Sequence, residues 1–231
     1  MIDWHSHILP EIDDGSQSVS ESLALLKRLR RQGVETVIAT PHFYANEKSV
    51  SSFLEQRSDS FEKIQNILSK KTPDIKLGAE VYYYSGISRM EDLKLLRVQD
   101  SRVLLLEMPM SQWTDYTIRE IIDIAGSRDF TVMLAHVERY IGLQPSGTLE
   151  RLCENGLLMQ VNASFFNGFF AKRKAIKLLK KGLIQFVGSD CHNVKNRPPK
   201  LDVAFELIQK KLGNDFLSEM DEFGRSILIS K

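Results

Sequence analysis

The sequence contains only two cysteines, no long apolar run and almost no excess of charge, and each shortage excludes a class of protein. Cys153 and Cys191 do not suggest a disulfide framework. No apolar run approaches the roughly 20 residues of a membrane-spanning helix, and the N-terminus lacks the basic and apolar regions of a signal peptide. We therefore expect a cytoplasmic protein without membrane insertion.

The charges are balanced and dispersed along the chain. Lys and Arg number 31 and Asp and Glu number 30, which gives a net charge of +1. Without a basic stripe or an acidic tail, binding of nucleic acid through bulk charge is not expected. The one local exception is Phe169–Lys181, which has the pattern of a basic amphipathic helix and whose cations we expect to form a solvated face.

Short apolar segments alternate with helical patterns along the 231 residues, which we expect to form a single domain spanning residues 1–231. Seven segments are predicted as strands: the run from Ile2, then Val34–Ala39, Ile75–Ala79, Val103–Leu106, Phe130–Ala135, Leu157–Val161 and Ile184–Gly188. Helices are predicted from the capping box at Ser18–Glu21 to Gly33, and over Ser51–Lys70, Thr117–Ala125, Thr148–Asn155, Phe169–Lys181 and Leu201–Leu212. The tail 214–231 has no clear pattern. This alternation predicts parallel strands, either in an open doubly wound sheet or in a barrel.

The chain has only five histidines, and all of them lie at or just after predicted strands. His5 and His7 are two residues apart, so in an extended strand they share one face. An isolated His-x-His pair also occurs in exposed turns, but His42, His136 and His192 have the same position relative to a strand. Several carboxylates do too: Asp13, Asp14, Glu80, Glu107 and Asp190.

Side chains from the ends of six strands meet only if the strands close into a ring, so we predict an α/β barrel of about seven strands. So many carboxylates and imidazoles would repel each other and desolvate poorly without cations, and their nitrogen and oxygen donors suit Mn, Fe, Zn or Co. Taken singly, Glu80 and Glu107 could form ion pairs, and His136 could be a core histidine. Together they predict a site for two or three divalent ions.

Several of these segments resemble the polymerase and histidinol phosphatase (PHP) family, specifically its bacterial protein-tyrosine phosphatases of the capsule and exopolysaccharide type. The matching segments are Asp3-Trp-His-Ser-His7, Leu9-Pro10, Asp13-Asp-Gly15, Ala39-Thr-Pro-His42, Gly78-Ala-Glu80, Leu106-Glu107, Ala135-His-Val-Glu-Arg-Tyr140, Val161-Asn162, Gly188-Ser-Asp-Cys-His192 and Arg197-Pro-Pro199. They extend over the chain up to about Leu212. The resemblance implies a distorted (β/α)7 barrel, the PHP fold, with a trinuclear centre that is usually manganese-dependent.

The resemblance also implies how the ligands are shared. One ion would lie between His5, His7, Glu80 and Asp190. A second would lie between Glu80, Glu107 and His136, with Glu80 bridging. A third would be held by Asp14, His42 and His192, of which Asp14 departs from the histidine used in other branches of the family. Asp13 has no assigned role.

The expected reaction is hydrolysis of a phosphomonoester by hydroxide activated by the metal ions, which lower the pKa of water. The resemblance implies that Arg139 stabilises the phosphoryl group, and Arg197 is a second candidate. It also implies a phosphotyrosine protein as substrate, with a bacterial tyrosine autokinase as the expected partner. Aromatic residues near the strand ends could pack against the phenyl ring or against one another at the rim: Phe43, Tyr44, Tyr82, Tyr83, Tyr84, Trp113 and Tyr140.

Three alternatives stay open at this stage. The substrate could be a small phosphomonoester such as histidinol phosphate, or the metals could be structural in a partner-binding module. Cys191 and Arg197 also have the spacing of a cysteine-dependent phosphatase, although the residues between them contain no glycine and the preceding Asp190 would raise the thiol pKa. The oligomeric state is left open.

Overall fold

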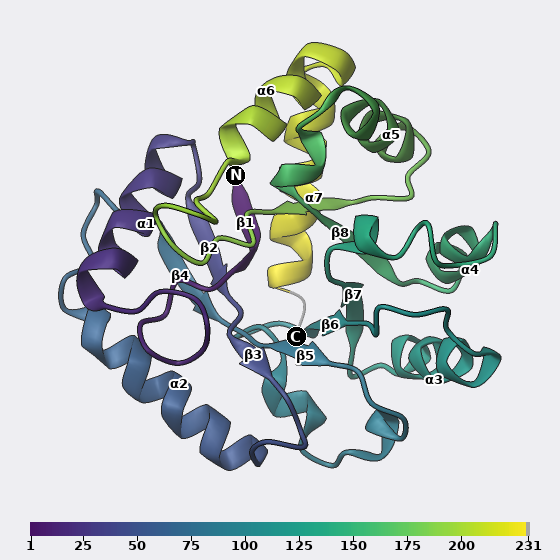
Figure 1. Cartoon of the computed structure of the whole chain (residues 1–231), viewed down its shortest axis with the longest axis horizontal. Coiled ribbons are helices and arrows are strands. Elements are labelled where there is room, and N and C mark those ends of the chain that lie inside the picture. The colour runs from purple at the N-terminus through teal and green to yellow at the C-terminus, as the bar shows by residue number, and fades with distance from the viewer. Residues whose placement is uncertain (230–231) are drawn as a thin grey trace.

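The computed structural model, which describes residues 1–229, is a ring of parallel strands with helices around its outside (Figure 1). Every strand pairing is parallel, in the orders β1-β2-β4 and β3-β5-β6-β7-β8-β9. The strands are β1 (Ile2–Ser6), β2 (Thr36–Ala39), β3 (His42–Phe43), β4 (Asp74–Leu77), β5 (Glu80–Tyr82), β6 (Val103–Glu107), β7 (Thr131–Leu134), β8 (Leu158–Asn162) and β9 (Phe186–Gly188). A bridge between Ser6 and Cys191 joins the last strand to the first. The predicted α/β barrel is confirmed.

Two of the predicted strands are interrupted at the rim. β2 stops before Thr40-Pro41 and resumes as β3, and β4 stops before Gly78-Ala79 and resumes as β5. Proline cannot donate to a strand ladder, which accounts for the first break. When β2 with β3 and β4 with β5 are each counted as one interrupted strand, the nine strands form a ring of seven. The third strand was predicted to end at Ala79, which was wrong, because β4 ends at Leu77. Glu80 opens β5 opposite His42 of β3.

The helices follow the strands as α1 (Val19–Arg31), α2 (Val50–Gln65), α3 (Asp115–Gly126), α4 (Thr148–Glu154), α5 (Phe169–Lys180), α6 (Leu201–Leu212) and α7 (Asn214–Leu228), with short 3-10 turns η1 (Ile87–Arg89), η2 (Leu93–Leu96), η3 (Val137–Arg139) and η4 (Ala163–Phe166). The predicted cap of α1 is confirmed, because the Ser18 hydroxyl accepts a hydrogen bond from the Glu21 amide. The predicted helix 51–70 ends earlier, at Gln65.

The tail forms a helix that the sequence did not predict. α7 lies against the middle of the ring (Figure 1), where Leu228 joins a buried cluster with Trp4 and Phe186. A Cβ atom on Gly224 would lie 2.9 Å from the Trp4 ring, so only glycine permits this close approach. Residues 230–231 of the tail lie outside the described residues. No helix within residues 1–229 is long and apolar enough to cross a membrane.

Candidate metal centre

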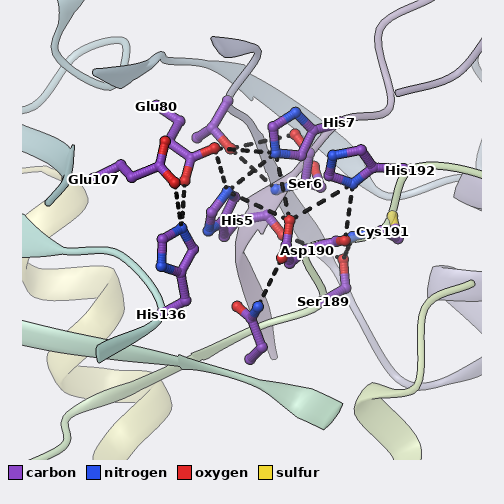
Figure 2. Close-up of polar contacts among 12 residues, drawn as sticks. His5, Ser6, His7, Glu80, Glu107, His136, Ser189, Asp190, Cys191 and His192 are labelled. Carbon is purple, nitrogen blue, oxygen red and sulfur yellow. Dashed lines mark hydrogen bonds and ion pairs between the residues drawn. The ribbon is translucent and has the colours of Figure 1, made fainter. Parts of the chain in front are cut away.

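The strand ends and the loops that follow them bring all nine predicted metal ligands to one region of the rim. Figure 2 shows Glu80 and Glu107 facing the ring of His136, and Asp190 lying among the histidines. Together the nine residues form four overlapping groups, each with ligand atoms within 4.8 Å of one another: His7, Asp14, His42 and His192; His5, His7 and Asp190; His5, Glu80 and His136; and His42, Glu80 and Glu107.

Glu80 lies at the centre of the cluster and is almost completely buried. Its Oε1 is 2.7 Å from His136 Nε2, and its Oε2 is 3.1 Å from His5 Nε2. Burial raises the pKa of this carboxyl group, but His5 and the hydrogen bond from His136 outweigh burial and hold the pKa well below its usual range. The two oxygens of one ionised carboxylate therefore face two different parts of the cluster.

Asp14 forms the outer edge of the cluster. Its Oδ1 lies 3.4 Å from His42 Nε2 and 3.3 Å from His192 Nε2, although its side chain is 66% exposed. Burial lowers the pKa of His192 to about 4, and the positive charge on His7 contributes to the shift. A neutral imidazole is the form that binds a metal ion.

Hydrogen-bond partners fix which nitrogen of three imidazoles carries a proton. His7 Nδ1 lies 2.7 Å from Asp13 Oδ2, and His192 Nδ1 lies 3.0 Å from the Asp190 carbonyl oxygen. Both partners can only accept, so both Nδ1 atoms donate. His5 Nδ1 likewise donates to Gln160 Oε1 at 3.2 Å.

In their neutral forms, these rings would therefore point Nε2 lone pairs at other lone pairs. His5 Nε2 lies 3.1 Å from His7 Nε2 and 3.1 Å from Glu80 Oε2. Within residues 1–229, the buried atoms Glu80 Oε2, His42 Nδ1 and His192 Nε2 have no hydrogen-bond partner. Burial lowers the pKa of His7, but Asp13 and Glu80 outweigh it and raise that pKa to about 10. This arrangement needs positive charge, and its nitrogen and oxygen donors fit divalent metal ions.

Two of the cluster residues have left-handed backbones. His136 has φ of 34° and Asp190 has φ of 49°, values that cost of order 1–3 kcal/mol each in residues other than glycine. Each lies two residues beyond the end of its strand, where the turn aims the side chain into the ring. Strain of this kind persists where the surrounding contacts hold it.

Arg139 and Arg197 lie together beside the cluster. Their Nη2 atoms are 2.7 Å and 2.8 Å from the same oxygen, Asp190 Oδ2. Arg139 therefore pairs with an acidic residue of the cluster. Both guanidinium groups are partly exposed and line a cavity of about 600 Å³ with Glu80, Glu107, His42 and His136.

Of the aromatic residues noted in the sequence, Tyr44 lines this cavity. Its ring stacks on the His42 ring, with centroids 5.4 Å apart. Phe43, Trp113 and Tyr140 are buried in the core instead. The Tyr140 hydroxyl still contacts the cluster, because its oxygen lies 3.1 Å from His136 Nδ1.

Cys191 lies apart from the cavity. Its side chain is completely buried in the apolar core, and burial together with the negative charge on Asp3 raises the pKa of its thiol. A buried, protonated thiol cannot serve as the nucleophile of a cysteine-dependent phosphatase.

Three supporting residues had no role in the sequence analysis. Gln160 Oε1 accepts from both His5 Nδ1 and the His136 amide, at 3.2 Å and 2.8 Å. Asp13 orients His7, and Asp3 accepts two hydrogen bonds from Ser189, which ties β9 to β1. A polar residue within the apolar strand segment Leu157–Val161 was the only sequence signal for Gln160.

Comparison with known proteins agrees with this architecture. Residues 1–222 match the family model described as capsular polysaccharide synthesis, CpsB/CapC. The tyrosine-protein phosphatase CpsB of Streptococcus pneumoniae is 33% identical over 92% of this chain and 91% of its own length, and the tyrosine-protein phosphatase YwqE of Bacillus subtilis is 29% identical over 93% and 86%. The structure is also similar to a solved chain, with a TM-score of 0.85 and 25% identity over 100% of this chain and 96% of the solved one. That chain comes from the crystal structures of YwqE from Bacillus subtilis and CpsB from Streptococcus pneumoniae, described as unique metal-dependent tyrosine phosphatases. The chain belongs to the CpsB/CapC family.

Proposed function

We propose that the chain is a metal-dependent protein-tyrosine phosphatase of the CpsB type that acts in capsular polysaccharide synthesis. The observation that carries this proposal is the convergence of imidazole and carboxylate lone pairs on the floor of a cavity whose wall carries two arginines. The relatives CpsB and YwqE, both tyrosine-protein phosphatases, support it. We further propose manganese as the metal and a bacterial tyrosine autokinase as the substrate protein.

The three ligand sets implied by the family resemblance are compact in the structure, and we assign them as the metal-holding residues. His5 and His7 face Glu80 and Asp190 across 3.1 to 3.8 Å. His136 faces Glu80 and Glu107 across 2.7 and 3.5 Å, and Asp14 faces His42 and His192 across 3.4 and 3.3 Å. Divalent ions in such sets lower the pKa of water and neutralise charge on phosphoryl oxygens.

Arg139 and Arg197 bind the phosphate in this proposal. A planar guanidinium group donates two parallel hydrogen bonds to a phosphate, and two such groups bound to one carboxylate oxygen are already close enough to share one anion. Negative charge on the non-bridging oxygens therefore meets fixed donors throughout the reaction.

Tyr44 forms the side of the cavity against which we place the substrate's phenyl ring. Its ring lies over His42, so a phenyl group that packs there holds its phosphate near the ligand cluster. A phenol ionises near pH 10, so the leaving group of phosphotyrosine requires less protonation than the alkoxide of serine.

The test is to purify the protein, measure its bound metals, and compare hydrolysis of a phosphotyrosine peptide, a phosphoserine peptide and histidinol phosphate. We expect the phosphotyrosine peptide to be preferred, a chelator to abolish activity and manganese to restore it. Hydrolysis that resists the chelator would overturn the metal-dependent mechanism. Preference for histidinol phosphate would overturn the substrate and leave the metal assignment standing.

A further inference from the structure

α5 and α6 border a second cavity, of about 500 Å³, on the outside of the ring. Its apolar side chains are Phe169, Ile176 and Leu207. Its charged side chains are all basic: Lys172, Arg173, Lys210 and Lys211. We call these seven residues the basic groove.

The cations of the basic groove have no acidic partner in the part of the chain that the structure describes. No ion pair within residues 1–229 includes any of the four. α5 and its cap carry six basic residues and no acidic one, although the whole chain has a net charge of only +1. Positive charge that is balanced elsewhere in the chain is therefore concentrated on this helix.

The apolar part of the groove is accessible. Phe169 is 56% exposed and the adjoining Phe170 is 82% exposed, which is unusual for two consecutive aromatic residues. The Arg173 guanidinium lies 4.3 Å from the centroid of the Phe169 ring, so a cation and an aromatic face are presented together. A ligand that carries both negative charge and an apolar side chain would satisfy both features.

Short stretches of chain connect the basic groove to residues that line the catalytic cavity. Ser164 of η4 lines that cavity, and Phe169 begins α5 five residues later. Lys200 also lines it and directly precedes α6. Figure 1 shows α5 and α6 next to each other outside the ring. Phe169 and Ile176 lie about 10 Å apart along the axis of α5. About three residues of an extended peptide would cover this distance.

We propose that the basic groove binds an acidic segment of the phosphoprotein substrate, with an apolar side chain of that segment against Phe169 and Leu207. This inference rests on the proposed function, because it takes the occupant to be the polypeptide whose phosphotyrosine enters the catalytic cavity. Charge complementarity selects an acidic partner. Self-association in which this face meets the same face of a second copy would oppose like charges.

The test compares a groove variant with a matched control. Arg173→Glu/Lys210→Glu reverses one charge on each helix of the groove. Lys174→Glu/Lys177→Glu reverses two charges on exposed positions of α5 that do not line it. The substrates are p-nitrophenyl phosphate, a phosphotyrosine peptide flanked by four glutamates and a leucine, and the same peptide with glutamines for glutamates.

We expect all three proteins to hydrolyse p-nitrophenyl phosphate equally. With the acidic peptide, the groove variant should lose on the order of tenfold in kcat/KM through a higher KM, because exposed charge pairs add modestly to ground-state binding. The control should change less than threefold, and 0.5 M salt should remove the difference between the acidic and glutamine peptides. Equal loss in the groove variant and the control would overturn the proposal.

Direct binding separates this proposal from the proposed function. A fluorescein-labelled, unphosphorylated form of the acidic peptide should bind the wild-type chain, and bind the groove variant on the order of tenfold more weakly, even if no phosphotyrosine were hydrolysed. Binding unaffected by the groove variant would overturn the proposal. So would groove-dependent binding to vesicles with 30% phosphatidylserine in place of the peptide, or a change in oligomeric mass of the groove variant in light scattering.

Discussion

Replacing Arg139 by alanine tests whether this side chain acts on the phosphate. Arg139 and Arg197 both contact Asp190 Oδ2, at 2.7 and 2.8 Å, and their side chains are 36% and 42% exposed. Removing one enclosed donor to a developing oxyanion typically costs about 10²–10³ in kcat. Because Arg139 is partly exposed, we expect the lower end of that range, about 100-fold, which corresponds to about 2.7 kcal/mol.

The two arginines should not act independently. With Arg139 absent, Arg197 still lies beside the same carboxylate and can retain part of the phosphate contact. The double variant Arg139→Ala/Arg197→Ala should therefore lose more activity than the product of the two single losses. Arg139→Lys, which keeps the charge without the planar pair of donors, should fall between wild type and Arg139→Ala.

The assay is steady-state hydrolysis of a phosphotyrosine peptide, with the metal content of each variant measured by mass spectrometry. Wild-type kcat in fully metal-loaded Arg139→Ala would refute the reasoning. If kcat and metal content fell together, the role of Arg139 would be to hold Asp190 for the metals, and not to bind phosphate.

Three other changes test the rest of the site and the fold. Cys191→Ser should keep its activity, because this thiol is buried away from the cavity, and a dead variant with intact metals would contradict the metal mechanism. Asp13→Ala should weaken manganese binding about 10- to 100-fold in a metal titration, because Asp13 orients His7, and unchanged affinity would exclude that role. Burial alone would raise the pKa of Glu120, but hydrogen bonds from Tyr83 and Ser88 lower it. The ionised Glu120 carboxylate should therefore stabilise the fold at neutral pH, and this effect should be lost as pH falls through the folded pKa of Glu120. Glu120→Gln should lower the free energy of unfolding, measured with urea, by about 1–2 kcal/mol at pH 7 and by much less at pH 3. An equal loss at both pH values would show that the charge of Glu120 has no role.

The sequence predicted the strand positions well because each buried strand is a short β-branched or apolar run between turn signals. It predicted the secondary structure less well where tertiary packing, and not the local residue pattern, decides where an element begins or ends. The break between β4 and β5 lies at Gly78-Ala79. A Cβ atom on Gly78 would lie 3.2 Å from the Val98 side chain, and no local pattern announces that contact. α7 was missed because its N-cap residue, Gly213, provides no side-chain cap and because the helix contains Gly224. Packing against Trp4 stabilises it instead.

The same difference between local pattern and tertiary contacts explains which site residues the sequence revealed. Most of the nine proposed ligands lie at or just beyond strand ends, where the residues of a barrel's active site are expected, and all nine are of residue types that bind metals. Asp14 lies in the loop after β1. Gln160 lies within β8 and reaches the cluster through hydrogen bonds to residues of two other strands, His5 and His136. Residues that orient a ligand need only a suitable hydrogen-bonding group, so their type alone does not mark them.

Asp190 connects the two halves of the proposed chemistry through its two oxygens. Oδ1 faces the imidazoles of His5, His7 and His192 at 3.5 to 3.8 Å, whereas Oδ2 accepts from both arginines. Burial would raise the pKa of this carboxyl group, but the histidines and Arg197 hold it well below its usual range, so both oxygens remain acceptors. A phosphate that draws the arginines away from Oδ2 would leave Oδ1 in place among the imidazoles. Substrate can therefore be exchanged at one side of this carboxylate without releasing the groups held at the other.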